Sequence, residues 1–161
     1  MYIRFITTGG TIDKIYFDAL SQFEVGESPI GAILSEGLVG FDYDVHPMFR
    51  KDSLEITGED RQALRAFVAA EEADRIIISH GTDTMVETAG ALADIPGKRI
   101  VLTGALTPAR FRTTDAVFNV GMAVAAVQLV EPGIYIAMNG QVFPAAAVRK
   151  NRKRNRFELR A

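Results

Sequence analysis

Several residue types are missing or rare in this chain of 161 residues. It contains no cysteine, no tryptophan and only two histidines. The absence of cysteine excludes disulfide frameworks, thiolate zinc sites, iron–sulfur clusters and cysteine nucleophiles. His46 and His80 lack the short spacing of paired metal ligands, and no Gly-x-Gly-x-x-Gly follows the first apolar run. Neither a metal nor an organic cofactor is therefore expected.

Long hydrophobic runs are missing too. None approaches the roughly 18 apolar residues of a membrane span, and the first residues lack the basic and apolar regions of a secretory signal. We therefore expect a cytoplasmic protein with no membrane partner. Hydrophobic residues make up 48% of the chain and charged residues 24%, which is typical of a folded globular protein. The length predicts a single domain over residues 1–161.

Charge is distributed unevenly along the chain. The net charge is −2, but residues 149–161 hold seven of the eighteen Lys and Arg residues and only one acid, Glu158. The remaining residues carry a balance of −8. A basic run such as Arg149–Arg156 is most often a solvated surface segment, and that is our prediction. Contact with nucleic acid or an acidic partner is the weaker alternative.

Apolar runs alternate with amphipathic stretches over most of the chain. We expect strands at 2–8, 43–49, 75–79 and 99–103, helices at 29–36, 57–72, 84–92 and 114–130, and a hairpin at 133–143 that turns at Asn139-Gly140. Ser28 is predicted to cap the first helix, and Thr57 with Asp60 the second. This alternation predicts a doubly wound, mostly parallel α/β fold, flavodoxin- or Rossmann-like, with helices on both faces, strand order 2-1-3-4-5 and a C-terminal hairpin.

The candidate catalytic residues follow the ends of two strands. Gly10 and Thr11 follow the first strand, and Gly81, Thr82 and Asp83 follow the third. In the predicted strand order both ends open on the crevice where such folds bind ligands. Two hydroxyls, a carboxylate and glycine-turn N–H groups would then meet there, as an acyl-transfer site requires. Taken singly, each of these residues is more often a turn or capping residue.

Four segments together resemble the bacterial-type L-asparaginases. They are Thr7-Thr-Gly-Gly-Thr-Ile12, Lys51-Asp-Ser-Leu-Glu-Ile-Thr57, Ser79-His-Gly-Thr-Asp-Thr-Met85 and Val101-Leu-Thr-Gly-Ala105, in that order. The resemblance covers nearly the whole chain but only the N-terminal domain of that family. It implies a short, single-domain form without the family's C-terminal domain.

The resemblance also implies an activity and a set of roles. The activity is hydrolysis of L-asparagine to L-aspartate and ammonia by double displacement, in a homo-oligomer that is a dimer or a tetramer. The implied catalytic residues are Thr11 as nucleophile, Tyr16 as its activator, and the group Thr82, Asp83 and Lys150, with Lys153 as the alternative lysine. The implied substrate-binding residues are Ser53 for the α-carboxylate, Asp83 for the α-amino group, and the turn glycines Gly10 and Gly81.

The chain departs from the family at two points. Leu54 stands where the long enzymes have a glutamine beside the binding serine, and the partner's glutamate that grips the α-amino group belongs to the missing domain. Weaker substrate binding is therefore expected. Hydrolysis of glutamine or another small amide, and a non-catalytic amino-acid-binding module, remain alternatives. The segment Ile12–Glu27 is predicted to be a long loop acting as a lid, with an ordered surface loop as the alternative.

Overall fold

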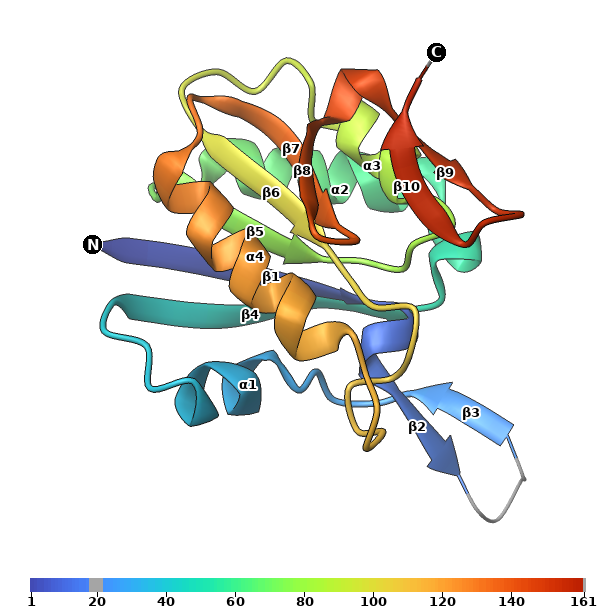
Figure 1. Ribbon diagram of the computed structural model, residues 1–161. Coiled ribbons are helices and arrows are strands. Elements are labelled where there is room, and N and C mark those ends of the chain that lie inside the picture. The colour runs from blue at the N-terminus through green and yellow to red at the C-terminus, as the bar shows by residue number, and fades with distance from the viewer. Residues whose placement is uncertain (18–21, 161) are drawn as a thin grey trace.

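The computed structural model describes residues 1–17 and 22–160 and is built around one sheet (Figure 1). The sheet has six strands in the order β4-β1-β5-β6-β7-β8. These strands are β1 (Tyr2–Gly9), β4 (Asp42–Lys51), β5 (Arg75–Ser79), β6 (Arg99–Thr103), β7 (Gly133–Met138) and β8 (Gln141–Pro144). The helices are α1 (Ile30–Glu36), α2 (Gly58–Ala70), α3 (Met85–Ala91) and α4 (Ala116–Leu129).

The sheet is parallel except at one edge. β1 pairs in parallel with β4 and β5, and β6 and β7 continue the parallel series. β8 adds an antiparallel edge strand, and Asn139 and Gly140 in its turn have φ values of 54° and 76°, as a type I′ turn requires. The predicted strand order 2-1-3-4-5 and the α/β class are therefore confirmed.

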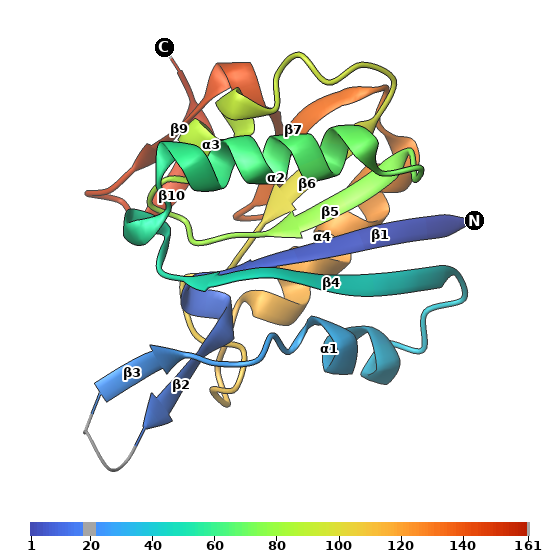
Figure 2. The ribbon, with the colours of Figure 1, turned by 180° about the vertical axis from the view of Figure 1, so that it is seen from behind.

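Helices cover both faces of the sheet (Figures 1 and 2). On one face, Ile76 and Ile78 of β5 pack with buried residues of α2 and α3. On the other face, Ile77 packs with buried residues of α1 and α4. Successive side chains of a strand point to opposite faces. The unbroken apolar run of β5 therefore follows from burial on both sides.

Capping residues predicted two helix starts, and one of these predictions is wrong. The Asp60 N–H donates to Thr57 Oγ1 and the Thr57 N–H to the Asp60 carboxylate, so the predicted pair opens α2. Ser28, by contrast, does not cap α1, where Pro29 takes the N-cap position. The Ser28 hydroxyl donates to Asp13 Oδ1 at 2.7 Å instead. Asp13 is buried, and a buried carboxylate needs hydrogen-bond partners.

The segment predicted as a long loop contains an antiparallel hairpin. A 3₁₀ turn at Thr11–Asp13 leads into β2 (Lys14–Phe17), which pairs with β3 (Gln22–Val25). The loop prediction is wrong for these strands, and residues 18–21 lie outside the described residues. Strands of four residues are too short to show a clear alternation in the sequence. The hairpin projects away from the sheet (Figure 2).

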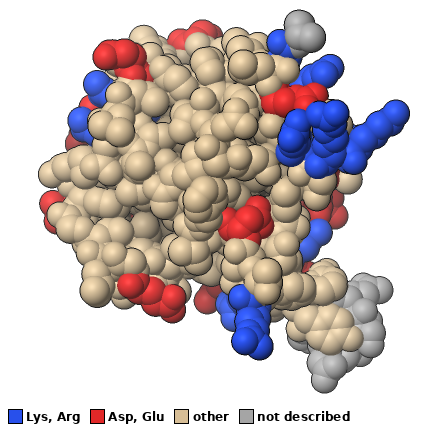
Figure 3. Space-filling model, viewed as in Figure 1, with Lys and Arg blue, Asp and Glu red and all other residues tan. Residues whose placement is uncertain are grey.

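The basic run near the C-terminus is also structured. Its residues form β9 (Val148–Asn151), which pairs antiparallel with β10 (Arg156–Leu159). Basic side chains gather over this hairpin in Figure 3, as predicted for a solvated surface segment. The hairpin itself was not predicted, because lysine and other charged residues are depleted in strands and obscure the pattern.

Helix α4 carries no charged side chain. Its inner side packs on the sheet, while Val117, Phe118 and Leu129 are exposed on its outer side. It has 14 residues, against the about 20 that a membrane-spanning helix needs. Within residues 1–17 and 22–160, no helix has both the length and the apolar character to cross a bilayer.

Candidate active site

The chain beyond β1 and the chain beyond β5 touch through two glycines. Gly10 has a φ of 86°, and a Cβ placed on it would lie 2.4 Å from the Gly81 Cα. A Cβ placed on Gly81 would lie 2.6 Å from the Ser53 Cβ. A larger residue at either position would overlap its neighbour, so this contact depends on glycine. It brings together the segments that carry Thr11 and Thr82.

Thr82, Asp83 and Lys150 are in direct contact. Lys150 Nζ lies 2.8 Å from Thr82 Oγ1 and 2.8 Å from Asp83 Oδ1. Thr82 is buried, and the Lys150 side chain is only 11% exposed. Arg152 Nε lies farther out, 4.0 Å from the same Asp83 oxygen. Lys150 is therefore the lysine that the fold places at Thr82, whereas Lys153 is an exposed turn residue.

The β9–β10 hairpin explains how a lysine from a basic run reaches this site. Lys150 lies directly opposite Phe157, so the two side chains share one face of the hairpin. Phe157 is buried in the core, and its N–H donates to Asn139 Oδ1 at 2.7 Å. Arg149, on the other face, pairs with Glu158 at the surface. The buried aromatic ring thus directs Lys150 inward.

Ser53 is held on a 3₁₀ turn between β4 and α2. The Asp52 carboxylate caps this turn by accepting from the Leu54 N–H at 3.2 Å. The Thr84 hydroxyl donates to the Ser53 carbonyl at 2.7 Å and so ties the turn to the start of α3. Ser53 is buried against Gly81, whereas Leu54 is 67% exposed. The Ser53 side chain therefore lies at the glycine contact, whereas the apolar side chain of Leu54 points to solvent.

Thr11 lines a cavity of about 360 Å³ with mostly apolar neighbours. Asp83 lines an adjacent cavity of about 690 Å³, and Lys14 and Phe23 line both. Lys14 Nζ pairs with the Asp52 carboxylate at 2.9 Å. Burial opposes ionisation of Asp52, but hydrogen bonds from Lys14 and backbone N–H groups outweigh it and lower the pKa of that carboxyl. Lys14 was not predicted; its only signal is a cation three positions after Thr11.

Tyr16 makes no hydrogen bond to Thr11 within the described residues. Its ring lies 5.6 Å from that of Phe23, which lies 5.9 Å from that of Phe111. Tyr16 is 53% exposed, and its hydroxyl has no hydrogen-bond partner in the described part of the chain. Pairing of β2 with β3 holds the ring on the projecting hairpin. The hydrogen bond to Thr11 that the resemblance implies is therefore not formed among the described residues.

A buried carboxylate lies at the root of the same hairpin. Burial raises the pKa of Asp13 to about 6, although hydrogen bonds from Ser28 and the Gly9 N–H and the charge of Arg50 act in the opposite direction. The Asp13 carbonyl also accepts from the Gly26 N–H at 2.9 Å. Asp13 therefore joins both ends of the hairpin.

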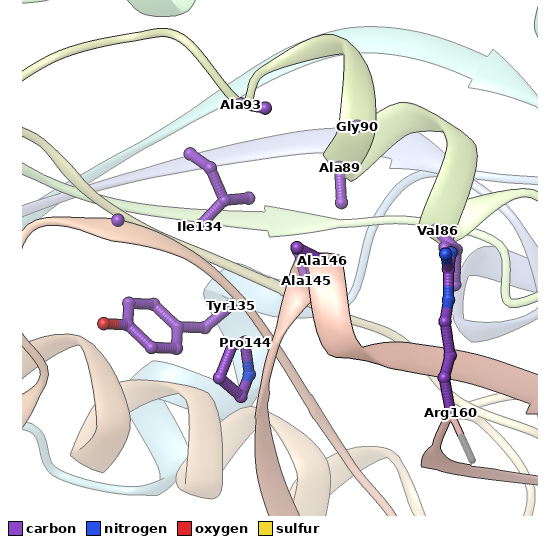
Figure 4. Close-up of a pocket in the computed structure, with 11 residues that line it drawn as sticks. Val86, Ala89, Gly90, Ala93, Ile134, Tyr135, Pro144, Ala145, Ala146 and Arg160 are labelled. Carbon is purple, nitrogen blue, oxygen red and sulfur yellow. The ribbon is translucent and has the colours of Figure 1, made fainter.

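A third cavity, of about 460 Å³, lies between α3 and the segment from β7 to β8 (Figure 4). Its lining is mostly apolar, with the Arg160 side chain at one end. It contains none of the predicted site residues. The candidate chemistry is therefore at the Gly10–Gly81 contact.

Comparisons with known proteins identify the family of this chain. Residues 2–160 match the protein family described as asparaginase, N-terminal. An L-asparaginase of Thermococcus kodakarensis is 31% identical over 160 residues, which are 93% of this chain and 48% of that protein.

Solved structures of L-asparaginases have a similar fold. The thermostable L-asparaginase from Thermococcus kodakarensis has a TM-score of 0.83 at 26% identity, covering 99% of this chain and 51% of that one. The probable cytoplasmic L-asparaginase from Campylobacter jejuni has a TM-score of 0.76 at 30% identity, covering 98% and 51%. The chain spans about half the length of these relatives. It belongs to the asparaginase family, and its residues 2–160 correspond to the N-terminal part.

Proposed function

We propose that this chain hydrolyses the side-chain amide of L-asparagine to L-aspartate and ammonia. The observation that carries the proposal is the contact of Lys150 Nζ with Thr82 Oγ1 and Asp83 Oδ1, each at 2.8 Å, beside the glycine contact that brings up Thr11. Membership of the asparaginase family supports the same substrate.

The reaction proceeds in two displacements. Thr11 Oγ1 attacks the amide carbon, the C–N bond breaks, and the amide nitrogen takes up the threonine proton and leaves as ammonia. An aspartyl ester on Thr11 remains. Water then attacks the ester carbon, the C–O bond to Thr11 breaks, and aspartate is released as the hydroxyl regains its proton. A covalent intermediate divides one difficult hydrolysis into two easier steps.

Proton transfer requires groups on both sides of the reacting carbon. We propose that Tyr16, after moving from its exposed position, takes up the Thr11 proton while passing its own to the leaving nitrogen. The second displacement is assigned to the Thr82 group. Lys150 Nζ holds the Thr82 hydroxyl and is itself held by Asp83, so this group is placed to relay a proton from the attacking water to the Thr11 oxygen. Such positioned groups each contribute about 10²–10⁴-fold to the rate.

Substrate binding is assigned to the groups around the glycine contact. Ser53 binds the α-carboxylate and Asp83 the α-amino group. The cavity beside Asp83 is also lined by Glu24 and Glu55, which supply negative charge for an ammonium group. Leu54 adds no hydrogen bond, so a high KM is expected.

We also infer that the chain acts as a homo-oligomer in the cytoplasm. The probable cytoplasmic L-asparaginase from Campylobacter jejuni supports the location. Light scattering of the purified chain tests the assembly, with a dimer or tetramer expected and a monomer contradicting it. Cell fractionation tests the location.

The test of function is a coupled ammonia assay on the purified chain with asparagine and glutamine side by side. Asparagine is expected to react faster. Thr11→Ala should abolish ammonia release and Thr82→Ala should abolish it beyond a single turnover, while the circular dichroism spectrum is unchanged in both. Faster ammonia release from glutamine would identify glutamine as the preferred substrate. Calorimetric binding of asparagine without ammonia release would support a binding module and contradict the proposal.

A further inference from the structure

His80 lies directly before the Gly81–Thr82 turn and has no part in the proposed displacements. It is fully buried. Its Nδ1 lies 2.8 Å from the Gly81 carbonyl oxygen, and its Nε2 lies 2.9 Å from Thr88 Oγ1. Arg61 Nε donates to the same Thr88 oxygen at 3.1 Å. A continuous chain of hydrogen bonds therefore runs from α2 through α3 to the turn.

Hydrogen-bond chemistry determines the direction of each bond in this chain. A carbonyl oxygen only accepts, so the proton must be on His80 Nδ1. A neutral imidazole has one N–H, so Nε2 accepts and the Thr88 hydroxyl donates to it. The Thr88 oxygen is then free to accept from Arg61. Burial, with a smaller effect of the Arg61 charge, lowers the pKa of His80 to about 4, so the ring is neutral near pH 7.

The backbone on either side of His80 is held as well. The His80 N–H donates to the Thr103 carbonyl at 2.8 Å. A Cβ placed on Gly104, the residue after β6, would lie 2.3 Å from the His80 carbonyl oxygen, so the turn after β6 packs tightly against this backbone. The next peptide group along the chain lies between Gly81 and Thr82. The hydrogen bond between the His80 ring and the Gly81 carbonyl fixes its orientation.

Holding the Gly81 carbonyl also directs the next N–H. The carbonyl of Gly81 and the N–H of Thr82 belong to one trans peptide, so they point in opposite directions. The carbonyl points to the buried ring, and the N–H therefore points away from it. Within residues 1–17 and 22–160, the Thr82 N–H has no hydrogen-bond partner. A hydrogen bond accepted by the carbonyl also polarises the peptide and strengthens its N–H as a donor.

We propose that His80 is a positioning residue, fixed as the Nδ1-protonated tautomer by the Gly81 carbonyl and held at Nε2 by Thr88 and Arg61, which aims the Thr82 N–H at the developing oxyanion of the substrate amide. The oxyanion role rests on the proposed function, whereas the tautomer does not. Among the described residues, the Thr88 hydroxyl is hydrogen-bonded to His80 and Arg61 and to no group assigned to the reaction.

The tautomer is tested by long-range ¹H–¹⁵N correlation of the imidazole at pH 7. Wild type and Thr88→Ser should both show a protonated Nδ1 and an unprotonated Nε2. Thr88→Val has the same shape without the hydroxyl, so Nε2 loses its hydrogen-bond donor, and the Nε2 and Thr82 amide resonances should both shift. Protonated Nε2 in the wild type, or an unchanged spectrum in Thr88→Val, would overturn the proposal. Because the wild-type spectrum is decisive alone, an unstable variant does not weaken the test.

Kinetics separate positioning from a merely structural role. Thr88→Val should lower kcat for asparagine about 10- to 100-fold, because a misdirected donor loses much of its stabilisation of the transition state. KM should stay within about twofold, and Thr88→Ser should restore kcat. Unchanged kcat per folded molecule in Thr88→Val would overturn the proposal. If the wild type releases no ammonia, the proposed function fails, and the imidazole spectrum still decides the tautomer.

Discussion

The two halves of the candidate site differ in how completely they are assembled. On the β5 side, Thr82 is buried and bonded to Lys150, and the glycine contact holds the backbone. On the β1 side, Thr11 faces an open apolar cavity, and Tyr16 lies exposed on the hairpin. Under the proposed function, the proton-transfer group is preorganised, and the nucleophile side closes when substrate binds.

The largest effect is expected on the assembled side. Lys150→Met should lower kcat for asparagine by about 10²–10⁴-fold, the usual contribution of a positioned proton-transfer group. The coupled ammonia assay measures it. Lys153→Met is the matched control, because it removes the same charge from an exposed turn residue, and it should keep activity within about twofold. Equal losses of kcat in the two variants would show that activity depends on the positive charge of the hairpin and not on the contact with Thr82.

The next effect tests whether the glycine contact is rigid. Gly10→Ala should lower the free energy of unfolding by about 3 kcal/mol or more, because its Cβ would overlap Gly81 at a strained φ. Gly97→Ala has a similar positive φ but open space around it, so it should cost about 1–2 kcal/mol. Urea denaturation measures both. Equal losses of unfolding free energy in the two variants would mean that the turns at Gly10 and Gly81 can move apart easily.

Closure on the nucleophile side is tested by Tyr16→Phe, which removes only the hydroxyl. It should lower kcat about tenfold or more if Tyr16 moves to Thr11 during turnover. Tyr43→Phe is the control, since Tyr43 packs against Phe5 and Phe41 away from the hairpin. Full activity of Tyr16→Phe would show that the exposed position is the working one, and that another group activates Thr11.

The smallest effect concerns stability between pH 4 and 6.5. The native pKa of Asp13, about 6, is above its usual value, so its contribution to stability falls as pH rises from 4 to 6. The native pKa of His80, about 4, is below its usual value, so its contribution is lost as pH falls from 6.5 to 4.

These two effects oppose each other in the wild type. Asp13→Asn removes only the first, so its unfolding free energy relative to wild type should increase by about 1–3 kcal/mol from pH 4 to pH 6.5. Chemical denaturation at several pH values measures this difference. A constant difference between the two proteins would contradict the raised pKa of Asp13.

The sequence predicted the sheet better than it predicted the site. Strands such as β5 are continuous apolar runs that only double burial explains, and their order places the two Gly-Thr turns together. The hairpins β2–β3 and β9–β10 were missed because each strand has four residues and many are polar. Lys150 was found only by resemblance, since its burial depends on Phe157 across the hairpin. Neither the exposed position of Tyr16 nor the Arg61–Thr88–His80 chain has a signal in local sequence, because both depend on contacts between distant segments.

The most direct test of the account is to trap the covalent intermediate. Wild-type protein, or Thr82→Ala if turnover is too fast, is mixed with asparagine, quenched in acid, digested and analysed by mass spectrometry. We predict one aspartyl group, attached as an ester to Thr11. An aspartyl group on another residue, or full ammonia release by Thr11→Ala, would contradict the account.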